Sequence, residues 1–80
     1  MNLIDKFLKI LSKKEKVLVK EALAFILAGR DLELRPEKMK GEKNHYRIRI
    51  GRVRIVYIKG REENVIRLVD FRDRVYKKLK

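Results

Sequence analysis

Arginine side chains at alternating positions are the feature of this sequence that points most directly to chemistry. Seven basic residues and no Asp or Glu lie between residues 43 and 61: Lys43, Arg47, Arg49, Arg52, Arg54, Lys59 and Arg61. If this segment forms strands, Arg47 and Arg49 share one face, and antiparallel pairing with the next strand brings Arg54 beside them. Because like charges on adjacent strands repel, we interpret the cluster as a site for an anion rather than as an ordinary solvated surface.

The other side chains exclude most alternative chemistries. His45 is the only histidine, cysteine is absent and the glycines stand alone, so the sequence predicts no metal site, no cofactor and no histidine or cysteine triad. Acid/base pairs are not indicated by spacing either. Six carboxylates fall in segments that are expected to form loops or turns: Asp31, Glu33, Glu37, Glu42, Glu62 and Glu63.

The tyrosines divide into two kinds. Tyr46 and Tyr57 are in phase with apolar strand positions, so we expect them in the core with their hydroxyls at the periphery. Tyr76 stands four residues after Arg72 in a basic tail. It is either a packing anchor or a phenol that faces the basic surface, and the residues alone leave both interpretations open.

Length and charge limit the class of protein. The chain has 80 residues, 45% apolar and 42% charged, with a net charge of +12, which predicts one small globular domain and a polyanionic partner, either nucleic acid or an acidic protein. The longest apolar run, residues 22–28, is far shorter than the roughly 20 residues that span a bilayer, so we expect no membrane association. The absence of cysteine agrees with a reducing cytoplasm.

Two helices are expected before the segment that carries the arginine cluster. Apolar residues between 3 and 11 recur at helical spacing. Ser12 and Glu15 then form a capping-box pattern that begins a second helix, and Gly29 supplies the left-handed conformation that ends it. The sequence therefore predicts a helical hairpin over residues 3–28, followed by a connecting loop over residues 30–45.

The second half of the chain predicts a sheet. Period-two alternation or β-branched enrichment marks three strands at residues 46–50, 53–58 and 65–69, joined by connections too short for a crossover. The expected fold class is α+β, with the helical hairpin packed on a small antiparallel sheet of about three strands within residues 45–70. A short basic tail over residues 71–80 completes a single domain of residues 1–80.

Residues 40–57 resemble the RelE/ParE toxin superfamily. Met39-Lys40-Gly41 is similar to the turn that precedes the family's pattern Tyr-Arg-x-Arg-x-Gly, here Tyr46 to Gly51. Arg54-Ile55-Val56-Tyr57 resembles the Arg-x-x-Tyr of the partner strand, and Arg72 with Tyr76 resembles a C-terminal pair. The resemblance covers about residues 12–78.

This resemblance implies a RelE-like mRNA endoribonuclease that acts on ribosome-bound mRNA, inhibits translation and is neutralised by an acidic antitoxin. The implied reaction is metal-independent attack of a ribose 2′-OH on the adjacent phosphate. Its implied catalytic residues are Arg47, Arg49, Arg54, Arg72 and Tyr76. The residues expected to bind mRNA or rRNA are Lys40, Lys43, Arg52, Arg74, Lys77 and Lys78.

Two departures from the family keep alternatives open. Nuclease relatives often have lysine or histidine at the catalytic positions, whereas Arg47 and Arg49 cannot release a proton, so acid/base duty would fall on Tyr76. Relatives usually have a strand before the helical hairpin, so this sheet is expected to be one strand short, with an edge open to another chain, including a second copy. The alternatives are a non-catalytic protein of the same fold, either a ParE-like gyrase inhibitor or an inactive toxin homologue, and a plain RNA-binding domain.

Overall fold

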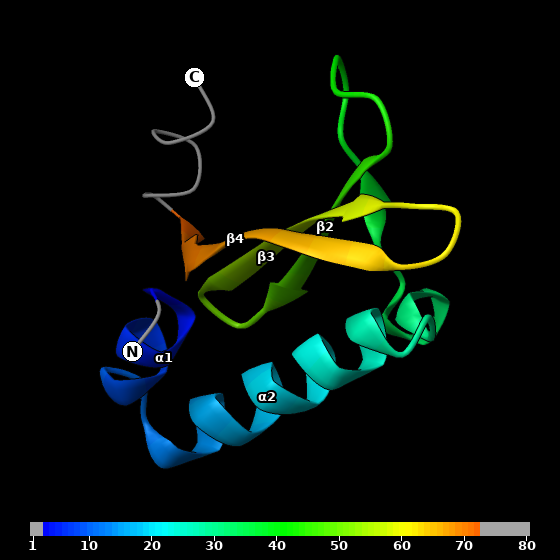
Figure 1. Cartoon of the computed structure of the whole chain (residues 1–80). Helices are drawn as coiled ribbons and strands as arrows, with labels where there is room; N and C mark the ends of the chain where they lie inside the picture. Colours follow the sequence, from blue (N-terminus) through cyan, green and yellow to red (C-terminus); the bar gives the residue numbers. More distant parts are fainter. Residues whose placement is uncertain (1–2, 73–80) are drawn as a thin grey trace.

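The computed structural model describes residues 3–72 as two helices, a short 3-10 helix and one sheet. Helix α1 (Leu3–Lys9) is followed across a short turn by α2 (Lys13–Leu27). The predicted capping box begins α2, because the Glu15 N–H donates to Ser12 Oγ at 3.2 Å and the Ser12 N–H donates to Glu15 Oε1 at 3.0 Å. Figure 1 shows α1 nearly end-on while α2 runs across the picture, so the two helices cross rather than lie side by side.

The segment after α2 is more structured than the expected loop. Gly29 takes the left-handed conformation (φ 78°) that ends α2, as its type and position predict. The next residues form the 3-10 helix η1 (Asp31–Leu34), and a two-residue strand, β1 (Glu37–Lys38), follows Pro36. The prediction of an irregular connection over residues 30–45 is therefore wrong for η1 and β1.

The sheet has four antiparallel strands rather than about three. Strand β2 (His45–Ile50), β3 (Val53–Lys59) and β4 (Asn64–Phe71) correspond to the predicted strands, and β1 pairs with the outer side of β2 to give the order β1-β2-β3-β4. Two residues paired with Tyr46 and Arg47 carry no periodicity signal, which is why sequence analysis missed β1.

The core lies between the helices and one face of the sheet (Figure 1). Side chains alternate across each strand, so the face toward the helices carries the apolar set. Its sheet members are Ile48, Val53, Ile55, Tyr57 and Val69, which meet Phe7, Leu8, Leu11, Val19, Ala22 and Ile26 from the helical side. Phe7 packs edge-on to Phe71 at 4.9 Å between ring centroids, which holds α1 against the end of β4.

One prediction for the core is wrong in detail. Tyr57 is a core residue, as expected, but its hydroxyl is fully buried instead of peripheral and donates to Asp31 Oδ2 at 2.6 Å. Tyr46 stacks on the Tyr57 ring at 5.7 Å and is only partly buried. The Tyr57 hydroxyl avoids the cost of an unbonded buried polar group because η1 brings Asp31 to it.

Candidate functional site

The strand register places three of the predicted site arginines on the sheet face away from the helices. Arg49 lies directly opposite Arg54 across β2 and β3, and Arg47 is two residues before Arg49 on β2. Directly opposed residues of an antiparallel pair share a face. Their strand neighbours Ile48, Val53 and Ile55 point the other way, into the core. We call the surface of Arg47, Arg49 and Arg54 the open face.

Glu37 supplies a negative charge to the open face that sequence analysis did not select. Its Oε2 accepts hydrogen bonds from Arg47 Nη2 and Arg49 Nη2, both at 3.2 Å, and its Oε1 lies 2.8 Å from Arg49 Nε. The absence of Asp and Glu from residues 43–61 therefore does not leave Arg47 and Arg49 without a carboxylate partner. Glu37 belongs to β1, outside that segment, and the pairing of β1 with β2 places it directly opposite Arg47.

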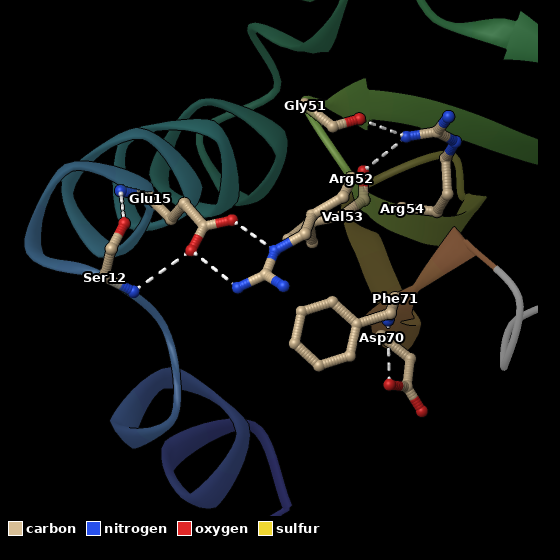
Figure 2. A network of polar contacts seen from close by, with 8 residues as sticks. All are labelled: Ser12, Glu15, Gly51, Arg52, Val53, Arg54, Asp70 and Phe71. Carbon is tan, nitrogen blue, oxygen red and sulfur yellow. Dashed lines mark hydrogen bonds and ion pairs between the residues drawn. The ribbon is translucent and has the colours of Figure 1, made fainter.

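Arg54 is held differently from the other two arginines. Its side chain is buried (7% exposed), and Nη1 donates to the Gly51 carbonyl at 2.6 Å and to the Val53 carbonyl at 3.0 Å. Asp70 lies opposite Arg54 in the register, and its Oδ1 accepts the Phe71 N–H at 2.8 Å. Figure 2 shows the Arg54 guanidinium directed at the turn between β2 and β3.

Arg52, predicted to bind RNA, points toward the helices instead of joining Arg47 and Arg49. Its Nε and Nη2 donate to the two oxygens of Glu15 at 2.7 and 3.1 Å, and its guanidinium lies 4.7 Å from the centre of the Phe71 ring (Figure 2). The hydrogen bond from Arg52 is the main cause that lowers the pKa of Glu15 to about 2.

The remaining predicted site residues are only partly placed. Arg72 is exposed directly after β4, and its backbone N–H donates to the Arg52 carbonyl at 2.9 Å. Lys40 and Lys43 are exposed in the connection between β1 and β2. The other four predicted residues lie outside the described part of the chain: Arg74, Tyr76, Lys77 and Lys78.

A second polar cluster, absent from the sequence-based candidates, lies at the far end of α2. Asp31 is 2% exposed and accepts hydrogen bonds from the Tyr57 hydroxyl and from Asn64 Nδ2 at 3.1 Å, while Lys59 Nζ lies 3.4 Å from Oδ2. Burial raises the pKa of Asp31, but these hydrogen bonds outweigh it and the net pKa is lowered. The available signal was Tyr57 itself, since a tyrosine at a core position needs a partner for its hydroxyl.

No protein-family model matches the sequence, and no curated protein matches it. A solved structure does. The chain resembles a chain of the RelB–RelE antitoxin–toxin complex from Methanococcus jannaschii with a TM-score of 0.73 and 26% sequence identity, over 94% of this chain and 91% of that chain. The fold is thus that of a component of a toxin–antitoxin complex. This likeness supports a role in a toxin–antitoxin system together with a partner protein.

The part of the chain from residue 3 to residue 72 contains no helix long and apolar enough to cross a membrane.

Proposed function

We propose that this chain is a RelE-like toxin, a single domain over residues 1–80, that cleaves ribosome-bound mRNA and is neutralised by an acidic antitoxin. The observation that carries the proposal is the placement of Arg47, Arg49 and Arg54 on one face of a sheet whose fold is similar to a chain of a RelB–RelE complex.

The toxin rather than the antitoxin side of that complex is favoured by charge and motif. The net charge of +12 suits a polyanionic substrate and an acidic partner. The strand pattern from Tyr46 to Gly51, which resembles the toxin superfamily, coincides with β2 and the start of its turn to β3. Lys40 and Lys43 extend the positive charge beyond the sheet and would contact mRNA or rRNA.

The proposed reaction is attack of a ribose 2′-oxygen on its own 3′-phosphate. The 2′-oxygen to phosphorus bond forms, and the bond from phosphorus to the 5′-oxygen of the next nucleotide breaks. Arg47 and Arg49, which expose part of their side chains, would stabilise the negative charge on the phosphorane. Guanidinium groups cannot take up or release the protons that this reaction moves.

Proton transfer therefore needs other groups. Glu37, which is 46% exposed and contacts both arginines, would take the 2′-OH proton once the phosphate replaces it on the guanidinium groups. Tyr76, which resembles the family's C-terminal tyrosine, would return a proton to the 5′-oxygen. The arginines would thus bind charge while Glu37 and Tyr76 move protons.

Expression of the chain alone tests the proposal. Translation should stop and transcripts should be cut, whereas Glu37→Gln should lower cleavage by about 100-fold or more with little loss of RNA binding. Glu62→Gln, a matched change at an exposed turn residue, should leave cleavage unchanged. Normal growth with intact mRNA at confirmed expression would contradict the proposal.

The contacts on the open face also favour a second candidate, a non-catalytic member of the same fold that binds an antitoxin, RNA or gyrase. Glu37 already neutralises part of the charge of Arg47 and Arg49, and Arg54 is engaged by backbone carbonyls. A pure binder should lose function when these arginines are replaced but tolerate Tyr76→Phe and Glu37→Gln. A nuclease should lose cleavage on Tyr76→Phe and Glu37→Gln as well as on replacement of the arginines.

A further inference from the structure

The turn between β2 and β3 is fixed to the start of α2 by a bidentate ion pair. Both oxygens of Glu15 accept from Arg52, through Nε at 2.7 Å and Nη2 at 3.1 Å. Glu15 is itself held by the capping box with Ser12, so its carboxylate cannot swing freely (Figure 2). The fork geometry of guanidinium and carboxylate defines direction as well as distance. Arg52 is therefore oriented by a rigid helix terminus.

The same turn supports two of the arginines proposed for the site. Gly51, the residue before Arg52, accepts a 2.6 Å hydrogen bond from Arg54 Nη1 through its carbonyl. The carbonyl of Arg52 accepts the Arg72 backbone N–H at 2.9 Å. Moreover, the Arg52 guanidinium covers the Phe71 ring, directly before Arg72, at 4.7 Å. A shift of this turn would therefore displace Arg54 and Arg72 together.

We propose that Glu15 and Arg52 are positioning residues: by fixing the turn between β2 and β3, they hold Arg54 opposite Arg49 on the open face and hold the Arg72 backbone against that turn. Glu15 and Arg52 pair with each other and not with Arg47, Arg49 or Glu37. The expected effect on RNA cleavage rests on the proposed function, whereas the expected effect on the geometry of the turn does not. The Arg52 side chain is 62% exposed and that of Glu15 is 24% exposed, so solvent screens the pair and it adds little to folding stability. Its main effect is on the geometry of the turn.

Glu15→Gln is the discriminating variant. Glutamine can retain the capping box with Ser12, but it removes the negative charge that pairs with Arg52. Glu21→Gln is the matched control because Glu21 is exposed on the same helix and forms no ion pair with the described residues. Arg52→Lys provides a second test, since lysine keeps the charge and loses the bidentate fork.

Two measurements on the full chain decide the proposal. In NMR spectra, Glu15→Gln and Arg52→Lys should shift the side-chain Nε–Hε signal of Arg54 and speed amide exchange of Arg72 about tenfold through local opening of the turn. In cleavage of mRNA on programmed ribosomes, kcat should fall about 10- to 100-fold with little change in KM, because misplacement of catalytic groups affects the chemical step. Glu21→Gln should match the wild type in both measurements.

The outcomes separate the two proposals. Unchanged Arg54 and Arg72 signals in both folded variants would overturn the positioning role, whatever the cleavage data show. A wild-type chain that cuts no RNA would overturn the nuclease function, while the NMR comparison would still decide whether Glu15 and Arg52 position these arginines. If Glu15→Gln fails to fold, as judged by its melting curve, Arg52→Lys carries the decision.

Discussion

At the scale of single residues, Asp31 is a buried carboxylate that three side chains hold in place. Its carboxylate is 2% exposed, and Tyr57, Asn64 and Lys59 approach it from β3 and β4. A buried carboxylate is costly unless such donors are present. With them, the charged form is favoured and the Asp31 pKa is lowered. This cluster ties the end of α2 to the turn between β3 and β4, since Asn64 also donates to the Ile26 carbonyl at 2.9 Å.

A lowered pKa makes stability depend on pH in a defined direction. The folded state binds the Asp31 proton less readily than the unfolded state does, so this contribution is complete above the unfolded pKa of about 3.9 and is lost as the pH falls through the lower folded pKa. Urea unfolding from pH 7 down to pH 2 should show a steeper loss of stability for the wild type than for Asp31→Asn.

Glu62→Gln, at an exposed turn residue, serves as the control and should follow the wild-type profile. Glu15, whose pKa is lowered to about 2, contributes to the same acid sensitivity. Equal pH profiles for the wild type and Asp31→Asn would show that the Asp31 cluster is not the source of the loss of stability at acid pH.

At the scale of elements, α2 is defined by local signals at both ends. Ser12 and Glu15 satisfy backbone N–H groups at its start, and Gly29 ends it with φ at 78°. A Cβ atom at Gly29 would meet no other heavy atom within 4 Å, so any cost of a side chain there comes from the backbone conformation alone.

Gly29→Ala should therefore destabilise the fold by about 1–2 kcal/mol, the cost of placing an alanine in the left-handed region. Gly29→Asn should cost less, because asparagine adopts this conformation more readily. The urea midpoint of each variant measures the difference. Equal losses for alanine and asparagine would contradict backbone strain as the cause.

Strand β1 shows how a minor element alters the site. It has two residues, yet its pairing with β2 carries Glu37 to Arg47 and Arg49. The repulsion expected among the strand arginines is thereby reduced. Any anion that binds Arg47 and Arg49 must compete with or displace Glu37, so binding by this face depends on β1 as much as on β2.

At the scale of the whole molecule, the net charge of +12 is offset locally at several places. Glu15, Glu33 and Glu37 are each paired with an arginine. The whole net charge attracts a polyanion from a distance. Only the basic side chains that contact phosphates release counterions from the nucleic acid on binding. Salt dependence therefore separates the open face from the rest of the surface.

For a single-stranded RNA oligonucleotide, the logarithm of the association constant should fall with the logarithm of salt concentration by about 0.7 per phosphate contacted. Arg49→Gln should reduce this slope by about 0.7 if Arg49 binds one phosphate. Arg30→Gln removes the same charge from an arginine paired with Glu33 at 2.6 Å, away from the open face, and should leave the slope unchanged. Identical slopes for both variants would indicate nonspecific attraction instead of binding at the open face.

Local features of the molecule were predictable from the sequence. The capping box joins residues three positions apart, Gly29 acts on its own turn, and the alternation from Tyr46 to Ile58 defines the faces of β2 and β3. Each depends on the geometry of a helix end or a strand over a few residues, so residue type and spacing suffice. The shared face of Arg47, Arg49 and Arg54 followed from that alternation and from antiparallel pairing.

The partners of the charged and buried polar groups, by contrast, depend on the packing of distant segments. Glu37 meets Arg49 across 12 residues, Tyr57 meets Asp31 across 26, and Arg52 meets Glu15 across 37. No periodicity relates these pairs, because their distances are set by how α2, η1 and β1 pack around the sheet. Residue type and spacing predicted α2, the three longer strands and the face that carries the arginines, but not η1 or β1. Packing determined which carboxylates those arginines meet, since ion-pair partners are chosen by proximity in space and not along the chain.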